Sequence, residues 1–345
     1  MKIIHFVHNY FGFSGASKQA VGIAKGINER DKEIEQQFFT LSASREITNA
    51  DGFVIHTSKK KLIPRCLQFI SLIKKFKPNV VHFHGADFAL LVLCKVFNVK
   101  VYWKSTLFGS DDFISLTSGK MGHVKKKLLK YIDVNNTLTK QIYLSNIKLL
   151  ECAKLVTIPN GVMISENNIK KDKVAIIVSA IIPRKSIYEG IEFFNKNLRK
   201  HGYRLFIIGP RSETLDGFDA SYYDHCFAIA NSDVYFMGEL PQLNVFDYLN
   251  KAQYLIHLSK QEGMPNVVLE AMSFGAYPIV TSMDGLSDEL IENGVSGFNV
   301  DGGIDFDVSL FKGENLFGRE FIRNNNSFSV VAGKTIDVYR KLVEN

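Results

Sequence analysis

The sequence is poor in the features that mark secreted, disulfide-stabilised or membrane-spanning proteins. Its 345 residues include four widely spaced cysteines, Cys66, Cys94, Cys152 and Cys226, without a CxxC pair. We therefore expect reduced thiols rather than a disulfide framework or a zinc site. No uncharged apolar run approaches the ~20 residues of a membrane span. The opening MKIIHFVHNYFG reaches Gly and Ser too soon for a signal peptide. These absences predict a cytoplasmic protein.

Two motifs that would directly indicate a cofactor or a metal are also missing. The loop HNYFGFSGAS at residues 8–17 follows an apolar run, but it lacks the GxGxxG spacing and the downstream acid of a dinucleotide site. The acidic pair Asp111–Asp112 does not have the DxD spacing typical of metal-dependent sugar transferases. We therefore expect no cofactor and no metal ligand.

The net charge of +7 conceals an asymmetry along the chain. Up to Ser165 there are 24 Lys and Arg against 11 Asp and Glu, a balance of +13. From Glu166 onward the counts are 18 and 24, a balance of −6, so the two halves sum to +7. A basic half favours anionic partners: nucleic acid, anionic lipid or a phosphorylated substrate.

Short β-branched runs alternate with helix-like stretches through the chain. Ala20, Ile23, Ala24 and Ile27 recur at the i, i+3, i+4, i+7 spacing of a helix face. This alternation predicts parallel sheets covered by helices. The predicted strands are Ile3–Val7, Val80–Phe83, Val99–Trp103, Val156–Ile158, Val174–Ser179, Leu205–Ile208, Val234–Phe236, Tyr254–Leu258 and Tyr277–Thr281.

The chain is too long for one domain of ~100–200 residues. Pro-Asn-Gly within Ile158–Val162 breaks the pattern ahead of a polar stretch. We therefore predict Rossmann-like domains over residues 1–165 and 166–328, and a helix over residues 329–345 that packs back on the first domain. Ligands of open α/β sheets bind beyond the carboxyl ends of the strands, so the loops that follow the strands are candidate sites.

The strongest local signal is QEGMPNVVLEAMSFG at Gln261–Gly275, between two predicted strands. Pro265 suits the first turn of a helix over Asn266–Phe274, which places Glu270 ~7.5 Å along its axis. Backbone N–H groups over residues 264–268 would favour a phosphate or an array of sugar oxygens. Carboxylates at Glu262 and Glu270 can accept hydrogen bonds from sugar and ribose hydroxyls. The alternative is a solvated Glu262 and a capping Glu270.

This segment resembles the retaining nucleotide-sugar glycosyltransferases of family 4, whose signature is two Glu separated by seven residues, here Glu262 and Glu270. The similarity extends over nearly the whole chain. It includes PNVVHFHG at 78–85, LFIIGP at 205–210, NSDVYFMGELP at 231–241 with Gly238 at its turn, and GLSDELIENGVSGF at 285–298. The resemblance implies the α/β GT-B fold, in which the parallel sheets of two Rossmann-like domains face a central cleft. It also implies that the C-terminal domain binds the nucleotide sugar and the N-terminal domain binds the acceptor.

The resemblance further implies roles for individual residues. Glu270 would hold the ribose hydroxyls, and Glu262 would face the hydroxyls of the donor sugar. Lys185, in SAIIPRKS, would neutralise the diphosphate. Arg184 would replace the family arginine, whose position is Ala180 here. The backbone amides that would help Glu262 bind the sugar belong to Gly263, Met264, Asn266 and Val267.

Three features of the first half depart from the family pattern or leave alternatives open. Phe108, in STLFGSDD, stands where the family has a histidine near the reacting sugar. The loop after the first strand has Ser14–Gly15 in place of two glycines, and Gly15 would let the backbone approach donor phosphates or acceptor closely. His84 would point into the cleft as a substrate-binding residue, although a structural role fits it equally well.

Two basic stretches, residues 59–78 and 119–132, mix Lys with Leu, Ile and Phe. This mixture suits a surface that rests on anionic lipid headgroups, and the alternative is a solvated helix face. We expect no nucleic-acid partner, because binding motifs and aromatic platforms are missing.

Together these patterns predict a metal-independent retaining glycosyltransferase. Its donor would be a nucleotide-diphosphate sugar, UDP-sugar favoured over GDP-sugar. Its acceptor would be a glycan or a polyprenyl-diphosphate-linked glycan of bacterial surface polysaccharide (O-antigen or capsule), met at the inner face of the membrane. The alternatives are a sugar-nucleotide epimerase of similar fold and a non-catalytic nucleotide-sugar-binding protein.

Overall fold

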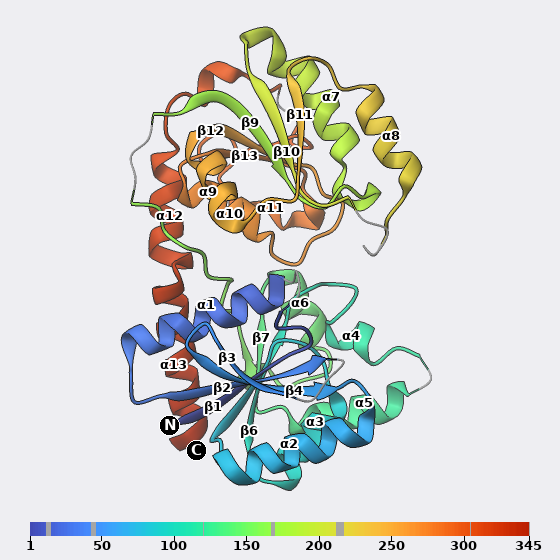
Figure 1. Cartoon of the computed structure of the whole chain (residues 1–345), viewed down its shortest axis with the longest axis vertical. Coiled ribbons are helices and arrows are strands. Elements are labelled where there is room, and N and C mark those ends of the chain that lie inside the picture. Colours follow the sequence, from blue (N-terminus) through green and yellow to red (C-terminus); the bar gives the residue numbers. More distant parts are fainter. Residues whose placement is uncertain are drawn as a thin grey trace. The chain divides into compact units, whose positions relative to one another are not determined.

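The computed structural model describes residues 1–11, 15–42, 46–119, 121–166, 170–211, 217–303 and 305–344. It divides into two compact units (Figure 1). The first comprises Met1–Gly161 and Ser327–Asn345, and the second comprises Val162–Asn326. The division thus lies before Val162, whereas we predicted it after Ser165, and the last helix belongs to the first unit.

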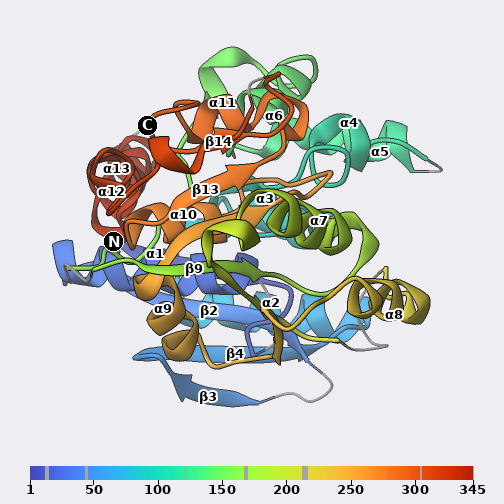
Figure 2. The same cartoon turned by 90° about the horizontal axis from the view of Figure 1, so that it is seen from above.

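The first unit is built on one twisted sheet in the order β3-β4-β2-β1-β5-β6-β7-β8. All neighbouring strands in it are parallel except β3 and β4, and β3 lies at the edge (Figure 2). The strands are β1 Lys2–Val7, β2 Glu35–Ser42, β3 Ile47–Ala50, β4 Phe53–Lys59, β5 Val80–Phe83, β6 Lys100–Ser105, β7 Val134–Thr137 and β8 Leu155–Val156. The helices are α1 Gly15–Arg30, α2 Leu62–Phe76, α3 Phe88–Val96, α4 Phe113–Leu116, α5 Gly122–Leu128, α6 Lys140–Asn146 and α13 Phe328–Glu344.

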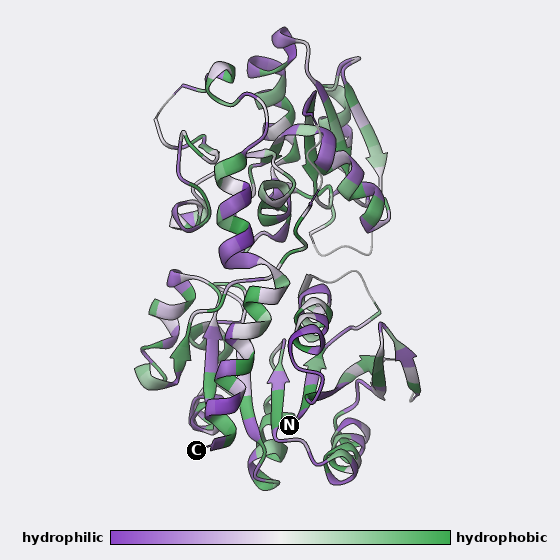
Figure 3. Cartoon of the chain, turned by 90° about the vertical axis from the view of Figure 1, so that its left-hand side faces the viewer, coloured by the Kyte–Doolittle hydropathy of each residue, from purple (hydrophilic) through white to green (hydrophobic). Residues whose placement is uncertain are grey.

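Helices α1 and α13 pack closely together and cover one face of this sheet. A side chain at Gly22 of α1 would bring a Cβ within 2.1 Å of the Phe328 ring, so only glycine fits this contact. Ile23, Ile336 and Tyr339 share one buried apolar cluster with the sheet. Figure 3 shows hydrophilic and hydrophobic segments alternating along α13, as a helix with one covered face requires. The chain therefore ends on the domain where it begins.

The second unit is built on a parallel sheet in the order β11-β10-β9-β12-β13-β14. Apolar clusters cover both of its faces. The strands are β9 Asp172–Val178, β10 Arg204–Ile208, β11 Val234–Gly238, β12 Ala252–His257, β13 Tyr277–Val280 and β14 Phe298–Asn299. The helices are α7 Ile187–Asn197, α8 Ala220–Ala228, α9 Gln242–Lys251, α10 Asn266–Ser273, α11 Ser287–Leu290 and α12 Leu316–Asn326.

The predicted strands are present, but the list of them was incomplete. Strands β2, β3, β4, β7 and β14 were missed. The sequence of β7 is VNNT, and its buried Asn135 and Asn136 satisfy their amides by hydrogen bonds to Trp103 O and Ile158 O. A strand whose polar residues are paired in this way does not show the apolar pattern of a buried strand. Within the described residues, no helix is both long and apolar enough to cross a membrane.

Candidate active site

The second sheet reverses its direction of winding between β9 and β12, which are neighbours in space. Ligands of such sheets bind at this point, outside the carboxyl ends of the two strands. The loop after β9 carries a short 3-10 helix, Pro183–Lys185, and the loop after β12 carries Glu262. Lys185 and Glu262, which lie 77 positions apart in sequence, are thereby brought into contact.

Glu262 is the centre of this contact. Its Oε1 accepts a short hydrogen bond from Lys185 Nζ and lies 3.1 Å from His257 Nε2, at the end of β12. The three side chains are largely buried, with 12% of Glu262, 16% of Lys185 and 5% of His257 exposed. The predicted catalytic pair is therefore assembled within one domain, together with a histidine that we did not predict.

The electrostatics of Glu262 follow from these contacts. Burial acts to raise the pKa of Glu262, but the nearby imidazole of His257 and the charge and hydrogen bond of Lys185 outweigh it. The pKa of the carboxyl group consequently lies far below its ordinary value of 4.5. Glu262 is therefore an ionised acceptor, able to receive hydrogen bonds from hydroxyl groups.

Arg184 lies at the rim of the same cluster. Its Nη1 donates to the Gln261 carbonyl at 2.7 Å and lies 4.0 Å from Glu262 Oε2. Its side chain is 44% exposed, so part of the guanidinium faces solvent. A second cation thus stands next to Lys185, as we inferred from its position in the sequence.

Helix α10 begins at Asn266, with Pro265 at the N-cap rather than inside the first turn as predicted. The Val268 N–H donates to Pro265 O at 3.0 Å, so this amide is used within the helix and cannot meet a ligand as we expected. Gly263, Met264, Asn266 and Val267 are half-buried around the helix start. Glu270 lies on the helix and accepts a hydrogen bond from Gln242 Nε2 at 3.4 Å.

Two glycines shape the neighbouring strand ends. A Cβ at Gly209, directly after β10, would lie 1.9 Å from Ser179 O, so the backbones after β9 and β10 approach more closely than any side chain allows. Gly238 ends β11 with a φ of +67°, and a Cβ on this residue would meet no atom within 4 Å. Its carbonyl oxygen accepts a hydrogen bond from the Gly209 N–H at 2.8 Å. Gly238 therefore forms an open turn at the end of the sheet, as predicted.

The corresponding reversal in the first sheet lies between β1 and β5. Gly15 is the first residue of α1, while Ser14 and the two residues before it lie outside the described part of the chain. Ser17, near the start of α1, donates a short hydrogen bond to Asn9 O. The beginning of α1 is thus tied to the beginning of the loop that leaves β1.

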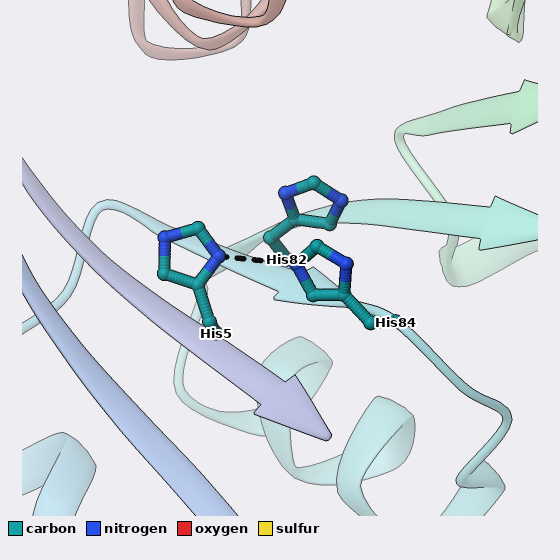
Figure 4. Close-up of side chains that lie close together, drawn as sticks. All are labelled: His5, His82 and His84. Atoms are coloured by element: carbon teal, nitrogen blue, oxygen red, sulfur yellow. Dashed lines mark hydrogen bonds between the residues drawn. The ribbon is translucent and has the colours of Figure 1, made fainter. Parts of the chain in front are cut away.

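His84 is buried in the first unit, with 4% of its surface exposed. Gln36 donates its amide to Ala24 O and Asn28 Oδ1, so its oxygen accepts from His5 Nε2 at 2.9 Å. His5 Nδ1 must then accept from His84 Nε2, 3.1 Å away (Figure 4). His84 therefore belongs to a buried hydrogen-bond chain, which favours the structural alternative over substrate contact.

A third histidine completes this buried cluster. The ring of His82 stacks on that of His84 with centroids 3.8 Å apart and planes at 21°, and its Nδ1 lies 2.5 Å from Tyr339 Oη. Ring nitrogens of His5, His82 and His84 lie within 4.8 Å of one another, close enough for a common metal ion. The lone pairs of two stacked rings, however, run side by side rather than converging. Burial lowers the pKa of all three histidines, so we interpret the group as a neutral structural cluster.

The residues around Phe108 have structural roles as well. Asp111 accepts hydrogen bonds from the N–H groups of Thr106 and Leu107 at 2.7 and 2.6 Å. Asp112 caps α4 and accepts from Ser115 and Ser145. Both carboxylates therefore hold this loop in its conformation.

Comparisons with known proteins agree with this geometry. Residues 162–307 match the family model described as glycosyl transferases group 1. The chain is 26% identical, over 79% of its length and 78% of the relative's, to the capsular polysaccharide biosynthesis glycosyltransferase CapH of Staphylococcus aureus.

Solved structures of similar fold span the whole chain. HepE of Anabaena, in complex with UDP and glucose, superposes with a TM-score of 0.76 at 12% identity, over 99% of this chain and 100% of that one. The sucrose-phosphate synthase of Thermosynechococcus elongatus gives 0.77 at 14% identity, over 99% of both chains. The predicted α/β GT-B fold class is thereby confirmed, and the match to the glycosyl transferases group 1 model lies within the second unit.

Proposed function

We propose that the protein is a metal-independent, retaining glycosyltransferase that takes its sugar from a nucleotide-diphosphate sugar. The observation that carries this proposal is the Lys185–Glu262 pair, assembled at the switch point of the second sheet beside the start of α10. An ionised carboxylate suits sugar hydroxyls, and an ammonium group suits the diphosphate.

The chemistry follows from where charge develops. When the bond between the anomeric carbon and the donor phosphate breaks, the sugar becomes oxocarbenium-like and negative charge grows on the leaving phosphate oxygen. Lys185 and Arg184 lie side by side in one loop and would meet this charge, assisted by amides at the N-terminus of α10. Because cations are supplied by the chain itself, the reaction needs no divalent ion.

Retention of the anomeric configuration is proposed from the family resemblance. The acceptor hydroxyl would attack from the face that the phosphate leaves, and the leaving phosphate oxygen would take its proton. Glu262 is bound to Lys185 and His257 in the structure, which suits a carboxylate that holds hydroxyls rather than one that attacks carbon.

The substrates are proposed from the relatives. HepE binds UDP and glucose, which favours UDP as the nucleotide and a hexosyl or N-acetylhexosaminyl group as the transferred sugar. CapH is named for capsular polysaccharide biosynthesis, which favours a glycan or polyprenyl-diphosphate-linked acceptor of a bacterial surface polysaccharide.

We further propose that the basic first unit docks on anionic membrane, where such an acceptor would be found. Helix α3 contacts both α2 and α5, and the three lie together on one side of the first unit (Figure 1). Helix α2 exposes Leu62, Ile63 and Leu67 to 55%, 72% and 63%, and α5 exposes Val124 to 49%. The exposed lysines on α2 and α5 are Lys74, Lys75, Lys126 and Lys127. Apolar side chains can enter the headgroup region while the lysines meet lipid phosphates.

A ligand screen followed by product analysis tests the enzymatic proposal. Purified protein is heated with a panel of UDP- and GDP-sugars, and a UDP-sugar should raise its melting temperature, since ligands that bind only the native state stabilise it. The stabilising donor is then incubated with lipid-linked acceptors. An extended glycan with retained anomeric configuration supports the proposal. A changed sugar nucleotide without transfer would indicate an epimerase, and binding without turnover a non-catalytic protein.

A further inference from the structure

We propose that His257 is a positioning residue for Glu262, which keeps this carboxylate ionised and oriented when Lys185 turns to the donor diphosphate. The inference rests on the proposed function. It starts from one fact of the structure: Lys185 and His257 both contact the same oxygen, Glu262 Oε1.

These two partners differ in how freely they can leave the carboxylate. Lys185 ends a flexible side chain on the loop after β9, so its ammonium group can move to a phosphate nearby. His257 is the last residue of β12, a central strand whose six residues are all buried. With 5% of its side chain exposed, its ring is held in place by packing. His257 thus remains beside Glu262 when Lys185 leaves.

A second partner is needed because Glu262 is itself largely buried, with 12% of its side chain exposed. A buried carboxylate without a hydrogen-bond donor takes up a proton rather than stay charged. Protonated Glu262 would lose part of its capacity to accept hydrogen bonds from the sugar. Among the described residues, the cationic or titratable side chains in contact with Glu262 are Lys185, Arg184 and His257. Arg184 Nη1 lies farther away, 4.0 Å from Oε2.

In the structure His257 Nε2 lies 3.1 Å from Glu262 Oε1 but makes no hydrogen bond within the described residues. It can donate to this oxygen in either protonation state when Lys185 leaves, provided that Nε2 carries its hydrogen. Neutral His257 with a protonated Nε2 can donate a hydrogen bond, and the imidazolium ion adds a charge. Glutamine can place an amide N–H in a similar position, whereas leucine fills comparable space without a donor. The pair of substitutions therefore separates hydrogen bonding from packing.

The test compares His257→Leu and His257→Gln with wild type in the transfer assay. For His257→Leu we expect kcat to fall ~10- to 100-fold, the range that corresponds to loss of a hydrogen bond to a charged group. The acid limb of its pH–rate profile should move to higher pH, because Glu262 now protonates more readily. His257→Gln should recover most of kcat and the wild-type position of the acid limb.

Controls distinguish the possible failures. His225→Leu changes an exposed histidine on α8 of the same unit and should leave both readouts unchanged. Thermal unfolding shows whether each variant is folded. If wild type transfers sugar and folded His257→Leu keeps its kcat and its pH profile, the role of His257 is refuted. An equal loss in His257→Gln and His257→Leu, with an unmoved acid limb, also refutes it. If wild type itself transfers no sugar, the proposed function fails instead.

Discussion

Replacing Lys185 by alanine should slow turnover far more than it weakens donor binding. In the structure the ammonium group is paired with Glu262 in a largely buried site. Binding the diphosphate therefore exchanges one anionic partner for another, and the net gain in ground-state affinity is small. We expect the donor Kd of Lys185→Ala to rise less than about fivefold, or by about 1 kcal/mol.

The transition state responds differently, because negative charge grows on the leaving phosphate oxygen as the glycosidic bond breaks. A preorganised group aimed at developing charge typically contributes about 2.7–4 kcal/mol, or ~10²–10³ in kcat. Arg184 remains beside the site in the variant but is 44% exposed, and exposed charges are screened by solvent. We therefore expect it to compensate only in part, and kcat to fall at least ~100-fold.

The assay combines calorimetric titration of the donor with single-turnover rates, so that binding and chemistry are measured separately. Lys260→Ala is the matched control. Lys260 lies in the loop after β12, is 67% exposed and is 3.8 Å from Glu189 rather than Glu262. Its replacement should change neither the donor Kd nor the single-turnover rate more than about twofold, because an exposed ion pair contributes little. A Lys185→Ala variant with Kd raised ~100-fold and an unchanged single-turnover rate would refute this reasoning.

Four further outcomes are expected. Glu270→Ala should raise the donor Kd about tenfold with little change in kcat, since a ribose contact acts on ground and transition states alike; an unchanged Kd contradicts the assignment. Activity should survive EDTA, and a loss that Mg²⁺ or Mn²⁺ reverses contradicts metal independence. Wild type should cosediment with anionic but not with neutral vesicles at low salt. Changing Lys125, Lys126 and Lys127 to Glu should release the protein, whereas changing Lys196 and Lys200 of the second unit to Glu should not. If wild type does not bind anionic vesicles, membrane docking is refuted. Because the pKa of Glu262 is depressed in the folded state, its contribution to stability is present above pH ~4.5 and lost on acidification. In urea unfolding, the difference in free energy of unfolding between wild type and Glu262→Gln should therefore shrink below that pH. A difference that does not change with pH contradicts the ion pair.

Much of the fold was predictable because parallel strands buried on both faces are continuous apolar runs. The runs in β5, β10 and β12 show this pattern, and the structure contains all three. Strand β7 was missed because its core positions hold asparagines, and their hydrogen-bond partners come from distant segments of the chain. Sequence periodicity reports burial and does not reveal which polar groups will be satisfied inside.

The same distinction explains which parts of the site were found. Glu262 and Lys185 lie in loops with a recognisable motif, so their proximity followed from the resemblance and from the rule that strand ends converge. His257 lies inside an apolar strand, where a single histidine has no signal until the neighbouring loop folds back on it. The alternation in HFHG puts His82 and His84 on one face, where their rings stack. It did not show that the face is covered by α13, whose Tyr339 comes from the far end of the chain.

The distribution of charge along the chain also distinguishes the proposed donor site from the proposed membrane-binding surface, which the net charge alone does not do. Lys185 and Arg184, the proposed partners of the diphosphate, lie in the half of the chain with a balance of −6. The proposed phosphate site therefore rests on these two cations and does not involve the basic half of the chain. The balance of +13 up to Ser165 is not explained by donor binding. Lysines and exposed apolar side chains share α2 and α5, and this combination fits an extended anionic surface better than a single phosphate group. The basic excess thus supports the proposal that the first unit meets a lipid-linked acceptor at the membrane.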